Sequence, residues 1–423
     1  MNRYQDIIGK VNYGIFLATV ALLPFPQILL RYMCVLWIIA WLLEGRWLSK
    51  PLSLRENKIA IPFILFGLWY IWKIVSGLWA SDYDAWAWQM ERYIAFGMII
   101  PIGIWGVNKH YDWRMMAKVL IVSCICAIPI YLVCFAIIFH HHELINFMQD
   151  KDEWDFSFTT FLPFFSSNIS YIKHRLFLCS VELLGAVMAI YTMRNRWWLL
   201  LPSLAIMLSS IWLTGSRQSV LSCVALGICM LILSLPRRDQ LRYSVGVLLF
   251  GAALGYCLLI VHPRMKDVKL TDFTEMRHVS YNHDVRFNIW GCALQQPSDY
   301  IWHGLGAGQS TRYMVEQYKK QNFDYYVYKH YHCHNQYLEE TMEIGIFGML
   351  LFVIAWLSIP FCAKGRGRHT AILFVILFML NMFTDCMFGR FCGIALWAAG
   401  LMIIFLQSHA QRNEQTARDT QTH

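Results

Sequence analysis

Long apolar segments are the feature that most limits how this chain can fold. Of its 423 residues, 57% are hydrophobic and only 15% are charged, which is too apolar for a soluble globular protein. Many of the segments are near the ~20 residues that a helix needs to cross a hydrocarbon core. We therefore predict an all-α, polytopic membrane protein.

About twelve membrane spans can be counted, followed by a short polar tail. The second is short, and a re-entrant hairpin with the first is an alternative. The first has no clear small-residue cleavage site, so we expect it to be a retained helix. The predicted spans cover residues 12–30, 32–44, 59–80, 92–108, 117–139, 176–193, 197–214, 218–236, 243–261, 341–362, 370–387 and 390–407.

Basic residues gather in alternate loops between the spans, and this pattern predicts the orientation by the positive-inside rule. It places both termini in the cytoplasm and residues 81–91, 140–175 and 262–340 outside. The net charge of +9 follows largely from these loops, so we expect no nucleic-acid partner. The basic loops contain Arg46 to Lys58, Lys109 to Lys118, Arg194 and Arg196, Arg237 to Arg242, and Lys364 to Arg368.

The segment 262–340 is far too long for a simple connection, and loops of that length are usually functional. Its amphipathic stretches, such as Val285–Leu294, predict short helices on the outer membrane face. The chain then divides into a membrane domain at 1–261 with about nine spans, this loop, and a membrane domain at 341–407 with the last three. Residues 408–423 are polar, and we expect a disordered cytoplasmic tail.

His334 is the leading candidate for chemistry in this loop. It directly precedes an apolar helix that Asn335 is suited to cap, and Glu339 is placed to orient an imidazole. A titratable imidazole at the membrane boundary can accept a proton from a substrate. The alternative is a structural, hydrogen-bonded histidine. The competing histidines of the loop are His283, His303 and His332.

Two arginines, Arg217 and Arg286, are predicted on the same outer side. Arg217 follows a Thr-Gly-Ser turn that favours a tight bend, and arginine is well suited to phosphate. Its alternative is snorkelling to lipid headgroups. Arg286 would share a helix face with Trp290, and its alternative is a surface ion pair with Asp284.

Two further outer segments each allow two interpretations. Glycines at Gly304, Gly306 and Gly308 permit close backbone approach to a ligand, but they could also form an ordinary turn. Asp82 and Asp84 form an Asp-x-Asp pair, which could hold a metal, contact a sugar or serve as a solvated loop. No cluster of histidine, cysteine and carboxylate strengthens the metal interpretation, so we predict no metal site and no cofactor.

Lys73 and Glu182 are the charged residues deepest in predicted spans, where ionisable groups are usually paired. Lys73 lies ~21 Å from the cytoplasmic end of its span, and Glu182 ~9 Å from the outer end of an oppositely directed span, at a rise of 1.5 Å per residue. In a core ~30 Å thick these depths coincide. We therefore predict a Lys73–Glu182 ion pair, with a functional proton path as the alternative.

Taken together, these motifs resemble the O-antigen ligase and polymerase superfamily, in order from about residue 60 to residue 360. Each motif alone is weak, but an ordered set on one side of a multi-span chain is fairly specific. The motifs are Ser81-Asp82, Thr214-Gly215-Ser216-Arg217, Arg286 with Trp290, the stretch Gly304–Gly308, His334-Asn335 with Tyr337-Leu338-Glu339, and Gly345-Ile346-Phe347-Gly348.

The resemblance implies a bacterial inner-membrane glycosyltransferase with its active site facing the periplasm. Its donor would be a glycan on undecaprenyl diphosphate, and its acceptor a lipid A–core sugar in a ligase or another lipid-linked glycan in a polymerase. The family reaction is inverting and metal-independent. Carried over by residue, Arg217 and Arg286 would bind the diphosphate and His334 would deprotonate the acceptor hydroxyl.

Other functions remain open from the sequence. A protein O-oligosaccharyltransferase is a third relative, although the chain ends soon after the last predicted span. A transporter for the same lipid-linked glycan would predict charges lining the spans and similarity between halves. Here the polar residues cluster outside the spans, which favours surface chemistry and the ligase interpretation.

Overall fold

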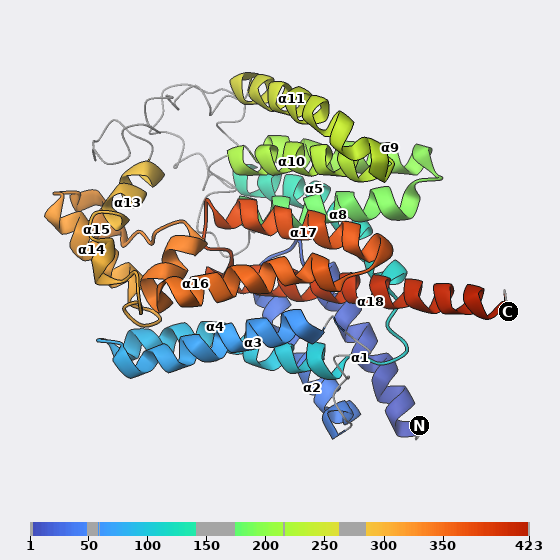
Figure 1. The fold of residues 1–423 in the computed structure, drawn as a ribbon, viewed down its shortest axis with the longest axis horizontal. Coiled ribbons are helices and arrows are strands. Elements are labelled where there is room, and N and C mark those ends of the chain that lie inside the picture. The colour runs from blue at the N-terminus through green and yellow to red at the C-terminus, as the bar shows by residue number, and fades with distance from the viewer. Residues whose placement is uncertain are drawn as a thin grey trace. The chain divides into compact units, whose positions relative to one another are not determined.

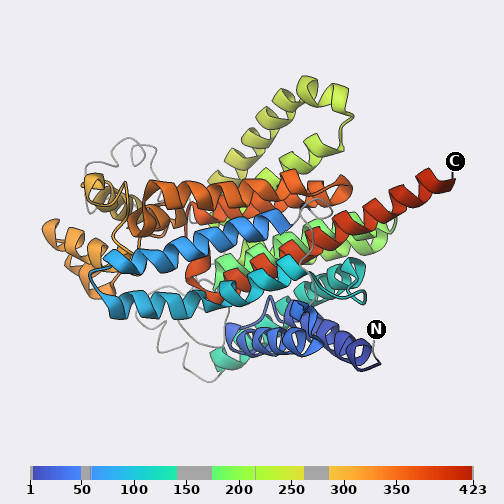
Figure 2. The same cartoon turned by 60° about the horizontal axis from the view of Figure 1, so that its bottom comes forward.

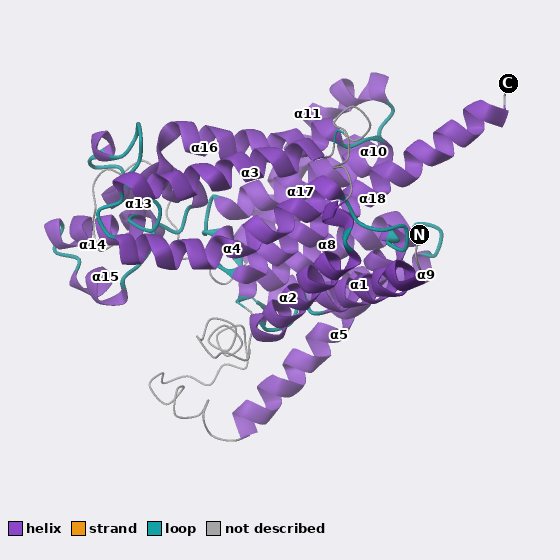
Figure 3. Ribbon diagram, turned by 90° about the horizontal axis from the view of Figure 1, so that it is seen from below, coloured by secondary structure: helices purple, strands orange, loops and turns teal. Residues whose placement is uncertain are grey.

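The computed structural model describes residues 3–48, 58, 60–140, 174–214, 216–261 and 285–421. Within these residues every regular element is a helix, with no strand (Figure 3). The chain forms two compact units, which we describe separately. The first contains residues 1–44, 108–264 and 395–407, and the second contains residues 45–107, 265–394 and 408–423.

The first unit is built from paired helices. Helix α1 packs against α2, α8 packs against α5 and α9, and α10 packs against α11. Part of α18 (Phe391–Gln421) also belongs to this unit. The helices are α1 (Arg3–Ala21), α2 (Gln27–Glu44), α5 (Trp113–His140), α8 (Arg175–Met193), α9 (Trp197–Leu213), α10 (Arg217–Ser234) and α11 (Arg237–Val261), as coloured from blue to yellow-green in Figure 1.

A buried polar network joins the α1–α2 hairpin to the segment before α5. The Glu44 carboxylate accepts hydrogen bonds from the amides of Asn12 (2.9 Å) and Asn108 (3.0 Å). Tyr111 donates to the Asn12 side chain (3.0 Å) and accepts from Trp37 (2.8 Å). Since buried polar groups are costly unless paired, this network fixes how the three segments meet.

The second unit is centred on α16. Helix α3 packs against both α16 and α4, and α17 packs against α16. Figure 2 shows α3 and α4 side by side, as Figure 1 does. The elements are η1 (Arg46–Leu48), α3 (Ala60–Val75), η2 (Ser76–Trp79), α4 (Tyr83–Trp105), α13 (Val285–Ala293), η4 (Pro297–Asp299), α14 (Ser310–Lys320), α15 (Asp324–Lys329), α16 (Gln336–Cys362), α17 (Gly365–Met382) and η5 (Met387–Gly389).

Aromatic side chains fill the interface between α3, α16 and η5. Trp356 lies edge-on to Phe66 and stacks on Phe388, with ring centroids 5.5 and 5.9 Å apart. Trp69 packs against Phe352 at 5.1 Å. These large rings are fully buried or nearly so, and they give this interface a large apolar contact area.

Seven of the described helical segments are long and apolar enough to cross a membrane, and two shorter ones are apolar. The prediction of a multi-pass helical membrane protein is therefore confirmed, whereas the number twelve stays a prediction. Helices α1, α4 and α17 are not among the seven, and each carries charged residues in its first turn. The seven segments are Gln27–Glu44, Ala60–Trp79, Trp113–Cys134, Arg175–Met193, Arg217–Ser234, Gln336–Cys362 and Phe391–Ala410.

Two predicted boundaries are wrong. The predicted first span, 12–30, runs across a break between α1 and α2, where Pro24 and Pro26 interrupt the helix. The tail 408–423, predicted to be disordered, continues α18 as a helix to Gln421. The sequence after Gly400 contains no further glycine or proline, so nothing in it breaks the helix.

Short helices, as predicted for the long loop, are present in its described part. Helix α13 coincides with the amphipathic stretch that we singled out, and α14 and α15 follow it. Together with the segment before α16 they enclose a small core of their own. Its buried members include Phe287, Trp290, Tyr300, Tyr313, Met314, Tyr318, Phe323, Tyr326 and Cys333.

The Glu44 network leads to a stability prediction. Replacing Asn108 by alanine removes a donor to the buried Glu44 carboxylate and another to the carbonyl of Gly9. We expect a loss of about 1–3 kcal/mol, because two buried hydrogen bonds are lost, one of them to a carboxylate. Thermal unfolding in detergent measures it, with the exposed Asn195→Ala as control. Equal melting temperatures for the two variants would contradict the network's role.

Candidate functional site

Helix α16 is broken at Gly345, just after the stretch that contains Glu339, Glu340 and Glu343. Gly345 has φ 71° and ψ 177°, outside helical geometry. A Cβ added there would lie 2.3 Å from the carbonyl oxygen of Trp302. Glycine is therefore required both for the positive φ and for the close approach of the neighbouring loop.

The break frees backbone groups of α16, and other segments satisfy them. The loop 301–306 supplies three of the hydrogen bonds and α3 supplies the fourth. This loop and the helix thus hold each other in place, because buried backbone groups need partners. The four bonds run from Leu305 N to Met342 O (2.8 Å), from Gly306 N to Glu343 O (2.9 Å), from Ile346 N to Ile301 O (2.7 Å), and from Trp72 Nε1 to Ile344 O (3.2 Å).

The glycines of this loop approach other parts of the protein closely. Gly304, Gly306 and Gly308 have φ of 76°, 98° and 83°. A Cβ on Gly304 would lie 2.4 Å from the Glu343 carbonyl oxygen, and one on Gly306 would lie 2.7 Å from the Ala80 Cβ. The loop therefore forms a turn that packs against α16 and against Ala80, while the ligand interpretation stays a prediction.

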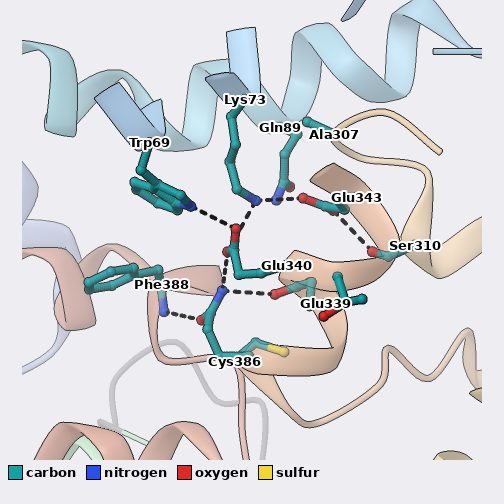
Figure 4. Close-up of polar contacts among 12 residues, drawn as sticks. Trp69, Lys73, Gln89, Ala307, Ser310, Glu339, Glu340, Glu343, Cys386 and Phe388 are labelled. Atoms are coloured by element: carbon teal, nitrogen blue, oxygen red, sulfur yellow. Dashed lines mark hydrogen bonds and ion pairs between the residues drawn. The ribbon is translucent and has the colours of Figure 1, made fainter. Parts of the chain in front are cut away.

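Lys73 is fully buried and pairs with two carboxylates of α16 (Figure 4). Its Nζ lies 2.6 Å from Glu343 Oε2 and 3.2 Å from Glu340 Oε1. The predicted Lys73–Glu182 pair is therefore wrong. Matching depth along two spans was the basis of that prediction, and depth does not identify which helices are neighbours. Glu182 is buried in α8, in the first unit.

Further hydrogen bonds satisfy the remaining oxygens of these carboxylates. The Gly308 backbone N–H and the Ser310 hydroxyl both donate to Glu343 Oε1 at 3.0 Å. Trp69 donates to Glu340 Oε2 at 2.8 Å. A buried ion pair is tolerated only when its remaining lone pairs are satisfied in this way. The network joins α3, the start of α14 and α16.

Gln336, the first residue of α16, extends the network toward η5. Its Nε2 donates to Glu340 (2.8 Å) and to Glu339 (3.3 Å), and its Oε1 accepts from the Phe388 backbone N–H (3.0 Å). Glu339 is buried in this network. Its carboxylate accepts from Gln336, and the described hydrogen bonds and ion pairs do not connect it to His334 as predicted.

Asn335 caps α16, as predicted. Its side-chain oxygen accepts hydrogen bonds from the backbone N–H groups of Tyr337 (3.0 Å) and Leu338 (3.1 Å). His334 directly before it has φ 47°, in the left-handed region. Such a residue is strained by about 1–3 kcal/mol and persists only where its surroundings fix it, often at a functional site.

Asp385 is the carboxylate that faces His334. His334 Nδ1 lies 3.5 Å from Asp385 Oδ1, and His332 Nε2 lies 4.0 Å from the same oxygen. The two imidazole centroids are 4.0 Å apart, and the His334 backbone N–H donates to His332 Nδ1 (3.2 Å). Asp385 is buried, whereas a quarter of the His334 side chain is exposed. A substrate can therefore reach the His334 ring.

Asp385 was not among the predicted site residues. The sequence indicates it only as an acidic residue in a short turn between two apolar segments, in Asn381-Met382-Phe383-Thr384-Asp385. Such a residue is usually solvated, and nothing local indicates a partner some 50 positions earlier.

His332, His334 and Asp385 also form the one described group whose side chains could together hold a metal, with ligand atoms within 4.8 Å of one another. Burial and the neighbouring His334 imidazole lower the pKa of His332, and the positive charges of Arg390 and Arg92 add to the effect. Two guanidiniums within electrostatic reach oppose a divalent cation. The arrangement is better suited to a base with a carboxylate partner.

Helix α13 is attached to the His334 loop through Trp290, whose indole N–H donates to the carbonyl of Cys333 (3.0 Å). Arg286 lies one turn earlier on the same helix, half-buried. The alternative partner of Arg286, Asp284, lies outside the described residues. Cys292 and Cys333 are both free thiols.

Arg217 begins α10 in the first unit. Ser216 caps this helix by accepting from the Ser219 backbone N–H (3.3 Å), so the turn before Arg217 is a helix start as the sequence suggested. Gly215 lies outside the described residues. Arg217 is half-buried.

The Asp-x-Asp pair begins α4. The Asp82 carboxylate accepts from the Ala85 backbone N–H (3.0 Å), and the Asp82 carbonyl accepts from Gln309 (2.8 Å). Arg312 approaches the carboxylate at 3.7 Å. Asp84 stands in the first turn of the helix. Capping and a favourable position at the helix N-terminus account for this pair without a metal.

One known family matches part of this chain. Residues 202–353 match the family model described as O-Antigen ligase. The match covers about a third of the chain and includes Arg217, Arg286 and His334, and over this stretch it confirms the resemblance to the O-antigen ligase and polymerase superfamily. A search of curated proteins found no match.

The break at Gly345 leads to a second stability prediction. Gly345→Ala introduces a Cβ at positive φ against the Trp302 carbonyl, so we expect a loss of at least about 1–2 kcal/mol. The control is Gly227→Ala in α10, where nothing lies within 4 Å of the added Cβ and helix propensity favours alanine. Thermal unfolding of both proteins in detergent distinguishes them. A Gly345→Ala protein as stable as the control would contradict the described break.

The Lys73 network is tested by a double-mutant cycle. Lys73→Met leaves two buried carboxylates without a cation, and we expect a loss of about 3–5 kcal/mol. Adding Glu343→Gln should recover part of that loss, because the two residues are coupled. Strict additivity of the two single effects would argue against the pair. Lys319→Met, at an exposed site on α14, serves as the control.

Proposed function

We propose that this chain is a glycosyltransferase of the O-antigen ligase type at the periplasmic face of the bacterial inner membrane. It would transfer a glycan from undecaprenyl diphosphate to a sugar hydroxyl of the lipid A–core. The observation that carries the proposal is a strained, accessible His334 beside buried Asp385, at the start of a helix within the O-antigen ligase match.

His334 would act as the general base. A sugar hydroxyl is a poor nucleophile until a base removes its proton, and a positioned imidazole typically contributes ~10²–10⁴-fold. The proximity of Asp385 to Nδ1 favours a proton on that nitrogen, which leaves Nε2 to accept the proton of the acceptor hydroxyl. Asp385 would also stabilise the imidazolium that forms.

The bond changes are those of a direct displacement. The acceptor oxygen attacks the anomeric carbon from the side opposite the diphosphate, and its proton passes to His334. The bond from the anomeric carbon to the phosphate oxygen breaks, and its electron pair leaves with undecaprenyl diphosphate. This displacement inverts the anomeric centre and uses no metal or other cofactor.

Negative charge builds on the diphosphate as that bond breaks. We assign Arg217 and Arg286 to bind it, because guanidinium groups pair with phosphate oxygens bidentately. The place of Arg286 on α13, one turn from the residue that bonds the His334 loop, supports its part. The assignment of Arg217 rests on its sequence motif and on the family match.

A polymerase that joins lipid-linked repeats is the second candidate, since the superfamily match covers both activities. The two reactions share the donor, the leaving group and the base. They differ only in the acceptor, so a single assay with both acceptors separates them.

The test is transfer in vitro by the purified protein, with undecaprenyl-diphosphate glycan as donor, lipid A–core as acceptor, and EDTA present. We expect transfer to survive EDTA and to fall at least ~10²-fold in His334→Asn. Asparagine tolerates the left-handed conformation, so this variant should fold. His330→Asn is the matched control, because His330 has φ 49° and is exposed.

The outcomes are distinct. Full activity in His334→Asn would remove this residue from the mechanism. Extension of the donor without any lipid A product would make the protein a polymerase. Loss of transfer on EDTA treatment, restored by a divalent metal, would overturn the metal-independent mechanism.

A further inference from the structure

We propose that Arg390 and Arg92 form a phosphate-binding site beside His334, and that its ligand is the diphosphate of the lipid-linked donor. The inference rests on the proposed function and deepens it, because it adds two binding residues from the second unit. Neither arginine was a candidate from the sequence.

The site is built around the short turn that contains η5. Asp385 comes just before η5 and Arg390 just after it. The Arg92 guanidinium donates a hydrogen bond to the Gly389 carbonyl, and the Phe388 N–H donates to Gln336. Helix α4, the start of α16 and this turn therefore converge where His334 stands.

Arg92 is held in place from two sides while staying exposed. Its guanidinium lies 4.4 Å from the Trp88 ring and donates to Gln89 Oε1 at 3.3 Å. A guanidinium carries five N–H groups in a rigid fork. The bonds to Gly389 and Gln89 leave donors for a ligand, and a fixed arginine loses little entropy on binding.

Arg390 has a guanidinium group that is open to a ligand. It is exposed, and among the residues that the structure describes its guanidinium has no hydrogen bond or ion pair. Together with Arg92 it lies close enough to lower the pKa of His332. Arg390 directly follows Gly389, whose carbonyl accepts from Arg92, so two exposed arginines stand at one turn, and this favours an anion over a cation.

The charge balance of the cluster points the same way. Arg92 and Arg390 contribute two positive charges and Asp385 one negative charge. His332 is neutral, because its pKa lies below the usual value. The excess is positive, which favours a phosphate over a metal cation. A phosphate there would also place the leaving group next to the proposed base.

The test measures binding without turnover. Undecaprenyl diphosphate is titrated into the full-length protein in phosphatidylcholine nanodiscs. We expect Arg390→Gln to weaken binding by ~10- to 100-fold and Arg390→Lys by less, because a charge-assisted, bidentate pair is lost or reduced. Arg92→Gln should weaken binding similarly. Arg312→Gln is the control, since Arg312 is exposed and pairs with Glu316.

Unchanged affinity in both Arg390→Gln and Arg92→Gln would overturn the proposal. A bilayer phospholipid is the other source of the same chemistry, so the titration is repeated with phosphatidylglycerol. If Arg390→Gln weakens retention of phosphatidylglycerol but not binding of undecaprenyl diphosphate, the site serves headgroups and the donor assignment is wrong.

This experiment separates the inference from the proposed function. If the wild type binds undecaprenyl diphosphate through Arg390 but transfers no glycan, the function fails and the site stands. If transfer proceeds and both arginine variants bind like the wild type, the site fails and the function stands.

Discussion

The arrangement of the second unit depends on neutralising one buried ammonium. Lys73 lies inside an apolar helix where an unpaired charge would cost several kcal/mol, and Glu340 and Glu343 provide the compensation. Three residues apart on α16, the two carboxylates face the same side of that helix. Their oxygens also accept hydrogen bonds from Trp69, Gly308, Ser310 and Gln336, so one charge determines how three separate stretches of sequence meet.

Hydrogen bonds connect the Lys73 network to the segment that contains His334. Gln336 joins the charged network to η5, Asn335 caps the same helix, and His334 takes the strained conformation that precedes the cap. The strained backbone of His334 persists because other hydrogen bonds fix the segments on both sides of it. Asp385 reaches the imidazole because η5 is bonded to Gln336. The proposed base is thus positioned by buried groups that never touch the substrate.

Local patterns in the sequence predicted local structure well. The cap at Asn335, helix α13 and the membrane class all follow from neighbouring residues. Pairings across the chain did not follow. Depth along the spans pointed to Glu182 as the partner of Lys73, whereas its partners lie on α16, and proximity in sequence favoured Glu339 over Asp385. Arg92 and Arg390 stand at the starts of two predicted spans, and only the fold brings them to one turn.

The break at Gly345 has a consequence for how such a protein can diverge. Because the freed backbone of α16 bonds to residues 301–306, the part of α16 before the break is tied to this loop as well as to Lys73 of α3. Helices α14 and α15 leave this scaffold near Ser310 and rejoin it near Cys333, with a core of their own. A change in the length or surface of residues 311–331 would therefore leave the Lys73 network and the cap at Asn335 in place, because neither is built from these residues.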